Sequence, residues 1–184
     1  NQVINFSNTF KDSKFLNKDN KETLSTLIKQ VDEYIKINDN FIKQRDSILL
    51  IIDGINNKKQ FNTSALNTLY SFLNDFFEQY NTLNETNKKS FIDTRNISKN
   101  IISNYGRPGA SLFGIGQPIP LNPDIWYVEN PSQCDKDFAE KYGVIQNSLK
   151  STNNFNELKN QVINFSNTFK DSKFLNKDNK ETLS

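Results

Sequence analysis

Residues 1–25 recur without a single substitution as residues 160–184, and both copies read NQVINFSNTFKDSKFLNKDNKETLS. An identity of this length does not arise by chance, so the chain holds one full period and the start of the next. We interpret it as a window of a tandem array. An engineered or circularly permuted chain, or a continuous polymer without a natural start, would give the same duplication.

The composition is polar for a domain of this length. Hydrophobic residues make up 35% of the chain and the mean hydropathy is −0.70, values that are low for a compact globule. Apolar residues nevertheless recur at helical spacing, which argues against disorder. A long, thin bundle with a large surface accounts for both observations.

Three segments carry long apolar stripes with helical periodicity. The stripes predict helices over 20–54, 64–104 and 132–170. In the last segment the apolar phase slips at STNN, between Leu149 and Phe155, so it is either one long kinked helix, which we favour, or two helices with a local break.

The first stripe follows a seven-residue repeat that includes Ile35, Ile42 and Leu49. Asn38 and Arg45 fall at two of its core positions, where polar residues usually fix register at a cost in stability.

The predicted fold is all-α. An elongated antiparallel three-helix bundle of long, coiled-coil-like helices buries all three stripes at once, and in helix number and length it resembles spectrin-type repeats. Residues 20–170 would form this unit. Residues 1–19 would be the end of a repeat, with a fraying helix end and a turn, and residues 160–184 the start of the next copy. The natural repeat is therefore expected to begin near Ser132.

One irregular segment, residues 105–131, interrupts the helical pattern, and we name it the tongue. It holds all five prolines and the single tryptophan, and the prolines exclude a regular helix. It is interpreted as an apolar crossover that caps the bundle, as a contact for a protein, peptide or glycan ligand, or as a membrane-seeking tip. Its candidate interaction residues are Leu112, Phe113, Ile115, Ile119, Leu121, Trp126 and Tyr127.

The residues available for chemistry are few. The absence of histidine excludes Ser-His-Asp and Cys-His catalysis within this chain. The single cysteine, Cys134, lies in the first turn of a predicted helix and is a candidate inter-repeat thiol. The acidic residues near the tongue, Asp124, Glu129, Asp135 and Asp137, are interpreted as surface charges. We therefore expect no enzyme activity, no cofactor and no metal site.

The charge pattern further limits the classes of partner. The net charge is only +2 and the charges are interspersed, so no basic face for nucleic acid is expected. The preferred hypothesis is a non-enzymatic repeat module of an extended surface or filament-forming protein, acting as a spacer, stalk or self-associating unit. Its partners would be neighbouring repeats, and its location extracellular or at the cell surface. The alternative is a membrane-active or host-binding protein, like helical pore-forming toxins, that acts through the tongue.

Overall fold

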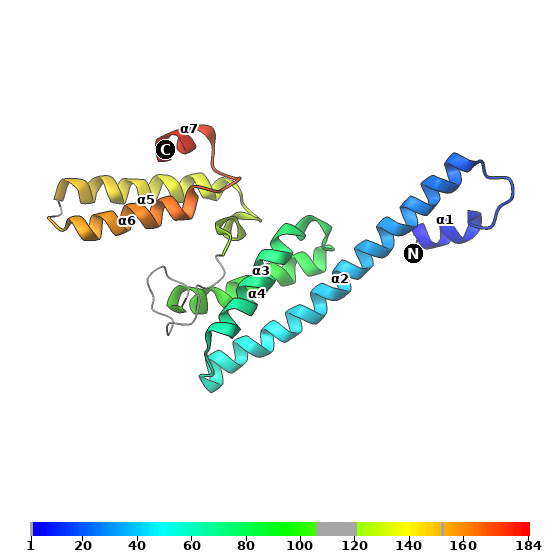
Figure 1. Ribbon diagram of the computed structural model, residues 1–184, viewed down its shortest axis with the longest axis horizontal. Coiled ribbons are helices and arrows are strands. Elements are labelled where there is room, and N and C mark those ends of the chain that lie inside the picture. Colours follow the sequence, from blue (N-terminus) through cyan, green and yellow to red (C-terminus); the bar gives the residue numbers. More distant parts are fainter. Residues whose placement is uncertain (1, 106–120, 152) are drawn as a thin grey trace.

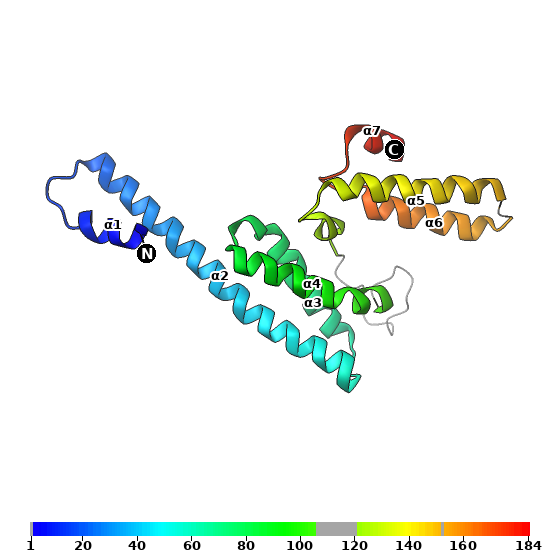
Figure 2. The same ribbon diagram turned by 180° about the vertical axis from the view of Figure 1, so that it is seen from behind.

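The computed structural model describes residues 2–105, 121–151 and 153–184, and this part of the chain contains helices and no β-strand. The all-α class is therefore confirmed. The helices form two groups, α1–α4 and α5–α7, and a short 3-10 helix, η2, lies where they meet (Figures 1 and 2). The elements are α1 (Gln2–Phe10), α2 (Lys18–Lys58), α3 (Thr63–Glu78), η1 (Tyr80–Thr82), α4 (Glu85–Tyr105), η2 (Pro123–Tyr127), α5 (Ser132–Ser151), α6 (Phe155–Phe169) and α7 (Lys177–Leu183).

Helix α2 is the longest helix of the described residues, and α1, α3 and α4 all pack against it. It ends at Lys59, which adopts a left-handed conformation (φ 53°), and the Gln60 N–H closes the end by donating to the Gly54 carbonyl at 3.0 Å. Its buried face runs through Phe41, Ile48, Ile52 and Ile55. Arg45 is half-buried on this face and donates to the Ser90 hydroxyl at 3.0 Å.

The seven-residue stripe predicted for this helix is displaced from the observed core. Ile35, Ile42 and Leu49 belong to that stripe but lie on the exposed side. Residues at a strict seven-residue spacing drift around a helix of 3.6 residues per turn, and Phe41 and Ile48 occupy the face that α3 and α4 cover.

The predicted helix over 64–104 is two helices, because η1 reverses the chain between α3 and α4. Leu83 is extended after η1 (φ −70°, ψ 143°), and the Asn84 side chain then caps α4 by accepting from the Asn87 N–H at 2.8 Å. Helices α3 and α4 fold back on each other and on α2 (Figure 2). Their shared core is rich in phenylalanine, with Phe41, Phe72, Phe76 and Phe91 almost fully buried.

Buried Asn38 on α2 binds the turn between α3 and α4. Its amide nitrogen donates to the Thr82 carbonyl at 3.1 Å and to the Tyr34 carbonyl at 2.9 Å. Its amide oxygen accepts from the Asn84 N–H and from the Asn87 side chain, both at 2.9 Å. One asparagine thus satisfies groups that the break in the helix would otherwise leave unpaired.

The predicted single helix over 132–170 is wrong, because α5 and α6 form an antiparallel hairpin. Asn154 begins α6, accepting from the Glu157 N–H at 3.2 Å. The reversal lets the two apolar stripes bury each other, with the Phe138 ring 4.9 Å from Phe165 and 5.3 Å from Phe169. The three-helix packing in the described residues is accordingly made by α2, α3 and α4, not by the three long helices expected.

Replacing Asn38 by alanine should lower the free energy of unfolding by between about 2 and 4 kcal/mol, because several buried partners lose their hydrogen bonds at once. Asn40→Ala, an exposed amide on the same helix, should change it by less than about 0.5 kcal/mol. Urea denaturation followed by far-UV circular dichroism checks both values. Equal losses would contradict the role of Asn38.

Candidate functional site

The two copies of the repeated segment adopt the same local structure. Each is a helix end, a turn and the start of a second helix. In the first copy Asn17 caps α2 by accepting from the Asn20 N–H at 2.8 Å, and in the second copy Asn176 caps α7 through Asn179 at the same distance. The shape of the segment is therefore encoded locally.

The second copy is held by the carboxylate of Asp124 on η2, which is fully buried. This carboxylate accepts from the Ser172 hydroxyl and from the Lys173 N–H, the latter at 2.9 Å. Asn122 caps η2 by accepting from the Asp124 N–H at 3.0 Å, and Pro123 starts the helix. The sequence Asn-Pro-Asp thus places a carboxylate where the turn of the repeated segment needs an acceptor.

A second carboxylate, on α5, holds the start of α7. Asp135 accepts from the Asn176 N–H and from the Asn179 side chain, both at 2.9 Å. Behind these polar contacts lies an apolar cluster, and we call the receiving surface the docking site. It consists of Asp124, Tyr127, Cys134, Asp135, Phe138 and Tyr142, and it receives Phe165, Phe169 and Leu175 of the second copy.

A buried arginine fastens η2 to the first group of helices. Arg95 on α4 donates to the Ile125 carbonyl at 2.9 Å and forms a two-pronged ion pair with Glu129. Its guanidinium also lies 5.6 Å from the centre of the Trp126 ring. Burial opposes ionisation of Glu129, but the hydrogen bonds and charge of Arg95 outweigh it and lower the pKa of this carboxyl.

The thiol of Cys134 contacts the second copy of the repeated segment. It is fully buried, and its Sγ lies 3.4 Å from the Ser172 Oγ. Burial raises the pKa of this thiol, and the nearby carboxylates of Asp124 and Asp135 add to the rise, against the hydrogen bond shared with Ser172. Burial and Asp137 likewise raise the pKa of Tyr127. Both groups therefore stay neutral at neutral pH.

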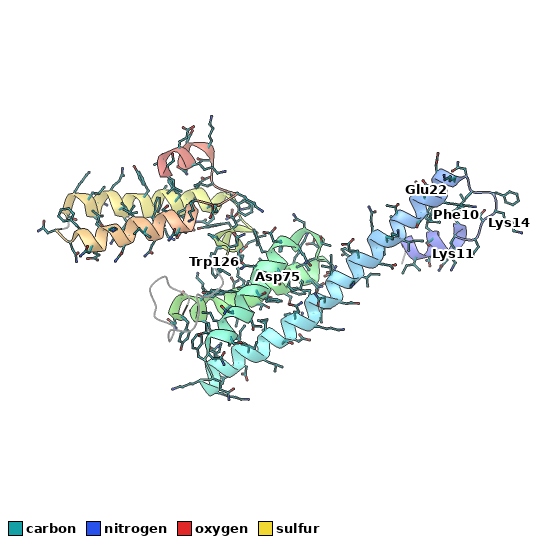
Figure 3. The ribbon with its side chains drawn as sticks, in the orientation of Figure 1. Phe10, Lys11, Lys14, Glu22, Asp75 and Trp126 are labelled. Atoms are coloured by element: carbon teal, nitrogen blue, oxygen red, sulfur yellow. The ribbon has the colours of Figure 1, made fainter. Side chains whose placement is uncertain are left out.

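The tongue is described only in part. The candidate residues Leu112, Phe113, Ile115 and Ile119 lie outside the described residues. Leu121 packs on the first core and Tyr127 is buried. Trp126, labelled in Figure 3, packs on the second core. The described end of the tongue therefore joins the two groups of helices through its own side chains.

The interpretation of the acidic residues as surface charges is wrong for Asp124, which is buried, and incomplete for Glu129 and Asp135, which bind named partners. Their partners lie 34 to 49 positions away along the chain, so sequence spacing carries no sign of them. The usable signal was local: a proline-started turn that ends in an aspartate, next to a buried apolar run.

Two simple patterns are relevant to the described residues, a metal-binding cluster and a membrane-spanning helix. Across residues 2–105, 121–151 and 153–184, no three carboxylate or thiol groups come together in a way that could hold a metal ion. Within the same ranges, no helix combines the length and the apolar character needed to cross a bilayer.

Comparison with protein-family models, with curated proteins and with solved structures finds no match for this chain. A function for this chain is therefore inferred from the geometry of the docking site and from the duplicated segment.

The duplicated phenylalanine provides a matched pair of variants. Phe169 is fully buried, whereas its equivalent Phe10 is 38% exposed and contacts the Phe6 ring at 5.0 Å. Phe169→Ala should destabilise the α5–α6 hairpin by about 3–4 kcal/mol, and Phe10→Ala should cost less than about 1 kcal/mol. Urea titrations read by circular dichroism and by Trp126 fluorescence give both values. Similar losses would show that the two environments do not differ as described.

The lowered pKa of Glu129 predicts an acid-sensitive junction. The pair with Arg95 stabilises the fold above the ordinary pKa of 4.5, and this contribution is lost as the pH falls through the lowered value. Glu129→Gln should therefore flatten the decrease in the urea midpoint below pH 4.5. The effect should be small, because the carboxylate is partly exposed. Glu140→Gln, on the exposed side of α5, is the control and should leave the decrease unchanged.

Proposed function

We propose that this chain is a non-enzymatic tandem-repeat module of an extended surface or filament-forming protein, in which it acts as a spacer, stalk or self-associating unit. One observation carries the proposal. The repeated segment closes one period by binding the docking site, and it then starts α7 with the same cap that starts α2.

Repetition of this kind suits a protein whose length is its function. In a repeat array each unit contacts mainly its neighbours, so length grows by adding units. Helix α2 alone has 41 residues, which corresponds to about 60 Å at 1.5 Å per residue. The two groups of helices lie side by side along the long axis rather than forming one globule (Figure 1).

The cohesion of the unit supports the same role. Arg95 and Asp124 connect the two groups of helices through η2, so that the two groups are held together within one period. Buried, hydrogen-bonded polar groups at a junction favour one arrangement over others, because a displaced partner leaves a buried group without compensation.

Chains of one, two and three periods should test the spacer role in small-angle scattering. The maximum dimension should increase by a constant amount with each added period. A collapsed chain would instead gain size only as a fractional power of its length, and this result would exclude a spacer. Leakage from anionic liposomes, measured on the same chains, should be absent; leakage that depends on residues 110–121 would favour the membrane-active alternative.

A further inference from the structure

The first copy of the repeated segment exposes side chains that the second copy buries or packs. Phe15 is 98% exposed, whereas its equivalent Phe174 packs against both cores. Phe6 is 53% exposed, whereas its equivalent Phe165 lies 4.9 Å from Phe138. The first copy therefore carries the docking face without the surface that it docks on.

The turn of the first copy shares two hydrogen bonds with the docked turn of the second copy. The Ser13 N–H donates to the Phe10 carbonyl at 3.0 Å, and the equivalent bond from Ser172 to Phe169 measures 3.1 Å. The Ser13 hydroxyl accepts from the Phe15 N–H, and the Ser172 hydroxyl accepts from the equivalent Phe174 N–H, both at 3.2 Å. Figure 3 shows this turn with Phe10, Lys11 and Lys14 at one end of the molecule. Since little ordering remains to be done, binding there loses little conformational entropy.

The polar groups of the first copy match the acceptors of the docking site. Ser13, Lys14, Asn17 and Asn20 are the equivalents of the four residues that donate to the two carboxylates. Lys14, Asn17 and Asn20 are exposed in the first copy. A partner surface with two carboxylates at the spacing of Asp124 and Asp135 would satisfy them.

Helix α1 can bind this surface without leaving α2. Positions 3, 6, 7 and 10 lie on one face of the helix. Val3 and Ser7 form one edge of this face, and Phe6 and Phe10 form the other. Helix α1 packs on α2 and buries Ser7, which leaves the phenylalanine edge exposed. In the second copy it is this phenylalanine edge that packs on α5.

The second copy shows that a third helix fits the same cluster. Leu183 on α7 packs against the cluster around Cys134 and Phe138. Its equivalent in the first copy, Leu24 on α2, is buried. The start of an α2-like helix therefore lies close to both α5 and the repeated segment.

We propose that the face formed by α1 and the turn 11–17 binds the docking site of another repeat of the same sequence. Helices α1 and α2 would then form a three-helix bundle with α5 of that other repeat. The identity of residues 1–25 and 160–184 selects this occupant, because the docked contacts need no new chemistry. The inference rests on the proposed tandem-repeat function and names the interface that such an array uses.

The proposal is tested with a full-length variant in which residues 160–184 no longer occupy the docking site of their own chain; we call it the emptied variant. The variant Phe165→Glu with Phe169→Glu disables the second copy and leaves the first copy unchanged. It should associate head to tail in analytical ultracentrifugation, whereas the unsubstituted chain stays a monomer. Adding Phe6→Glu and Phe10→Glu should abolish the association.

The native cysteine supplies a trap for the expected contact. In the emptied variant, Ser13→Cys should form a disulfide with Cys134 of another chain under copper-catalysed air oxidation, because the equivalent Ser172 lies 3.4 Å from that thiol. Asp12→Cys, an exposed neighbour in the same turn, should not. Ser172→Cys in the otherwise unchanged chain is the positive control and should form the bond within one molecule.

Three results would overturn the proposal. Association that persists after Phe6 and Phe10 are replaced would show non-specific apolar contact. A variant that remains monomeric and untrapped at every concentration, while the positive control forms its disulfide, would show that the first copy does not bind the docking site. If α5 unfolds when emptied, association must restore its helicity as the concentration rises, and constant low helicity counts against the proposal. Constant length increments in scattering would still support the spacer role.

Discussion

The buried carboxylate of Asp124 is the interaction on which the arrangement of the two groups of helices depends. A charge taken out of water is tolerated only when hydrogen bonds replace its hydration, and here a hydroxyl and a backbone N–H of the repeated segment supply them. On the other side of η2, the buried guanidinium of Arg95 likewise needs hydrogen-bond partners, and the Ile125 carbonyl is one of them. Each charge is stable only in the assembled junction, so the polar contacts specify one geometry while the apolar cluster supplies most of the burial.

Much of the secondary structure follows from local pattern, and the all-α class was predictable because apolar residues recur at helical spacing. What local pattern could not show was where the chain reverses. Between α3 and α4 the apolar spacing continues, and the reversal depends on Asn38, which lies more than forty positions away. Between α5 and α6 a phase slip was visible, but whether it bends one helix or separates two depends on tertiary burial.

The site was harder to predict than the fold, for a related reason. Sequence analysis favoured the apolar tongue, because exposed hydrophobic residues suggest a partner. The polar turn of the repeated segment gave no sign of a binding role in the sequence, yet Ser172 is buried and bonded to Asp124. A polar residue at an interface differs from a polar residue in water only by its partners, and these are brought close by folding. The duplication was the exception, since it identified the segment before its contacts were known.

The short connection between Ser151 and Phe155 has a consequence for synthesis. In the proposed array, identical segments would offer every α5 several equally good partners, and pairing with a wrong copy would entangle distant repeats. Because only a few residues separate α5 from α6, the copy that directly follows α5 emerges from the ribosome right after it and closes a smaller loop than the copy that precedes it. Speed of local pairing can thus select the correct partner where affinity cannot distinguish among copies.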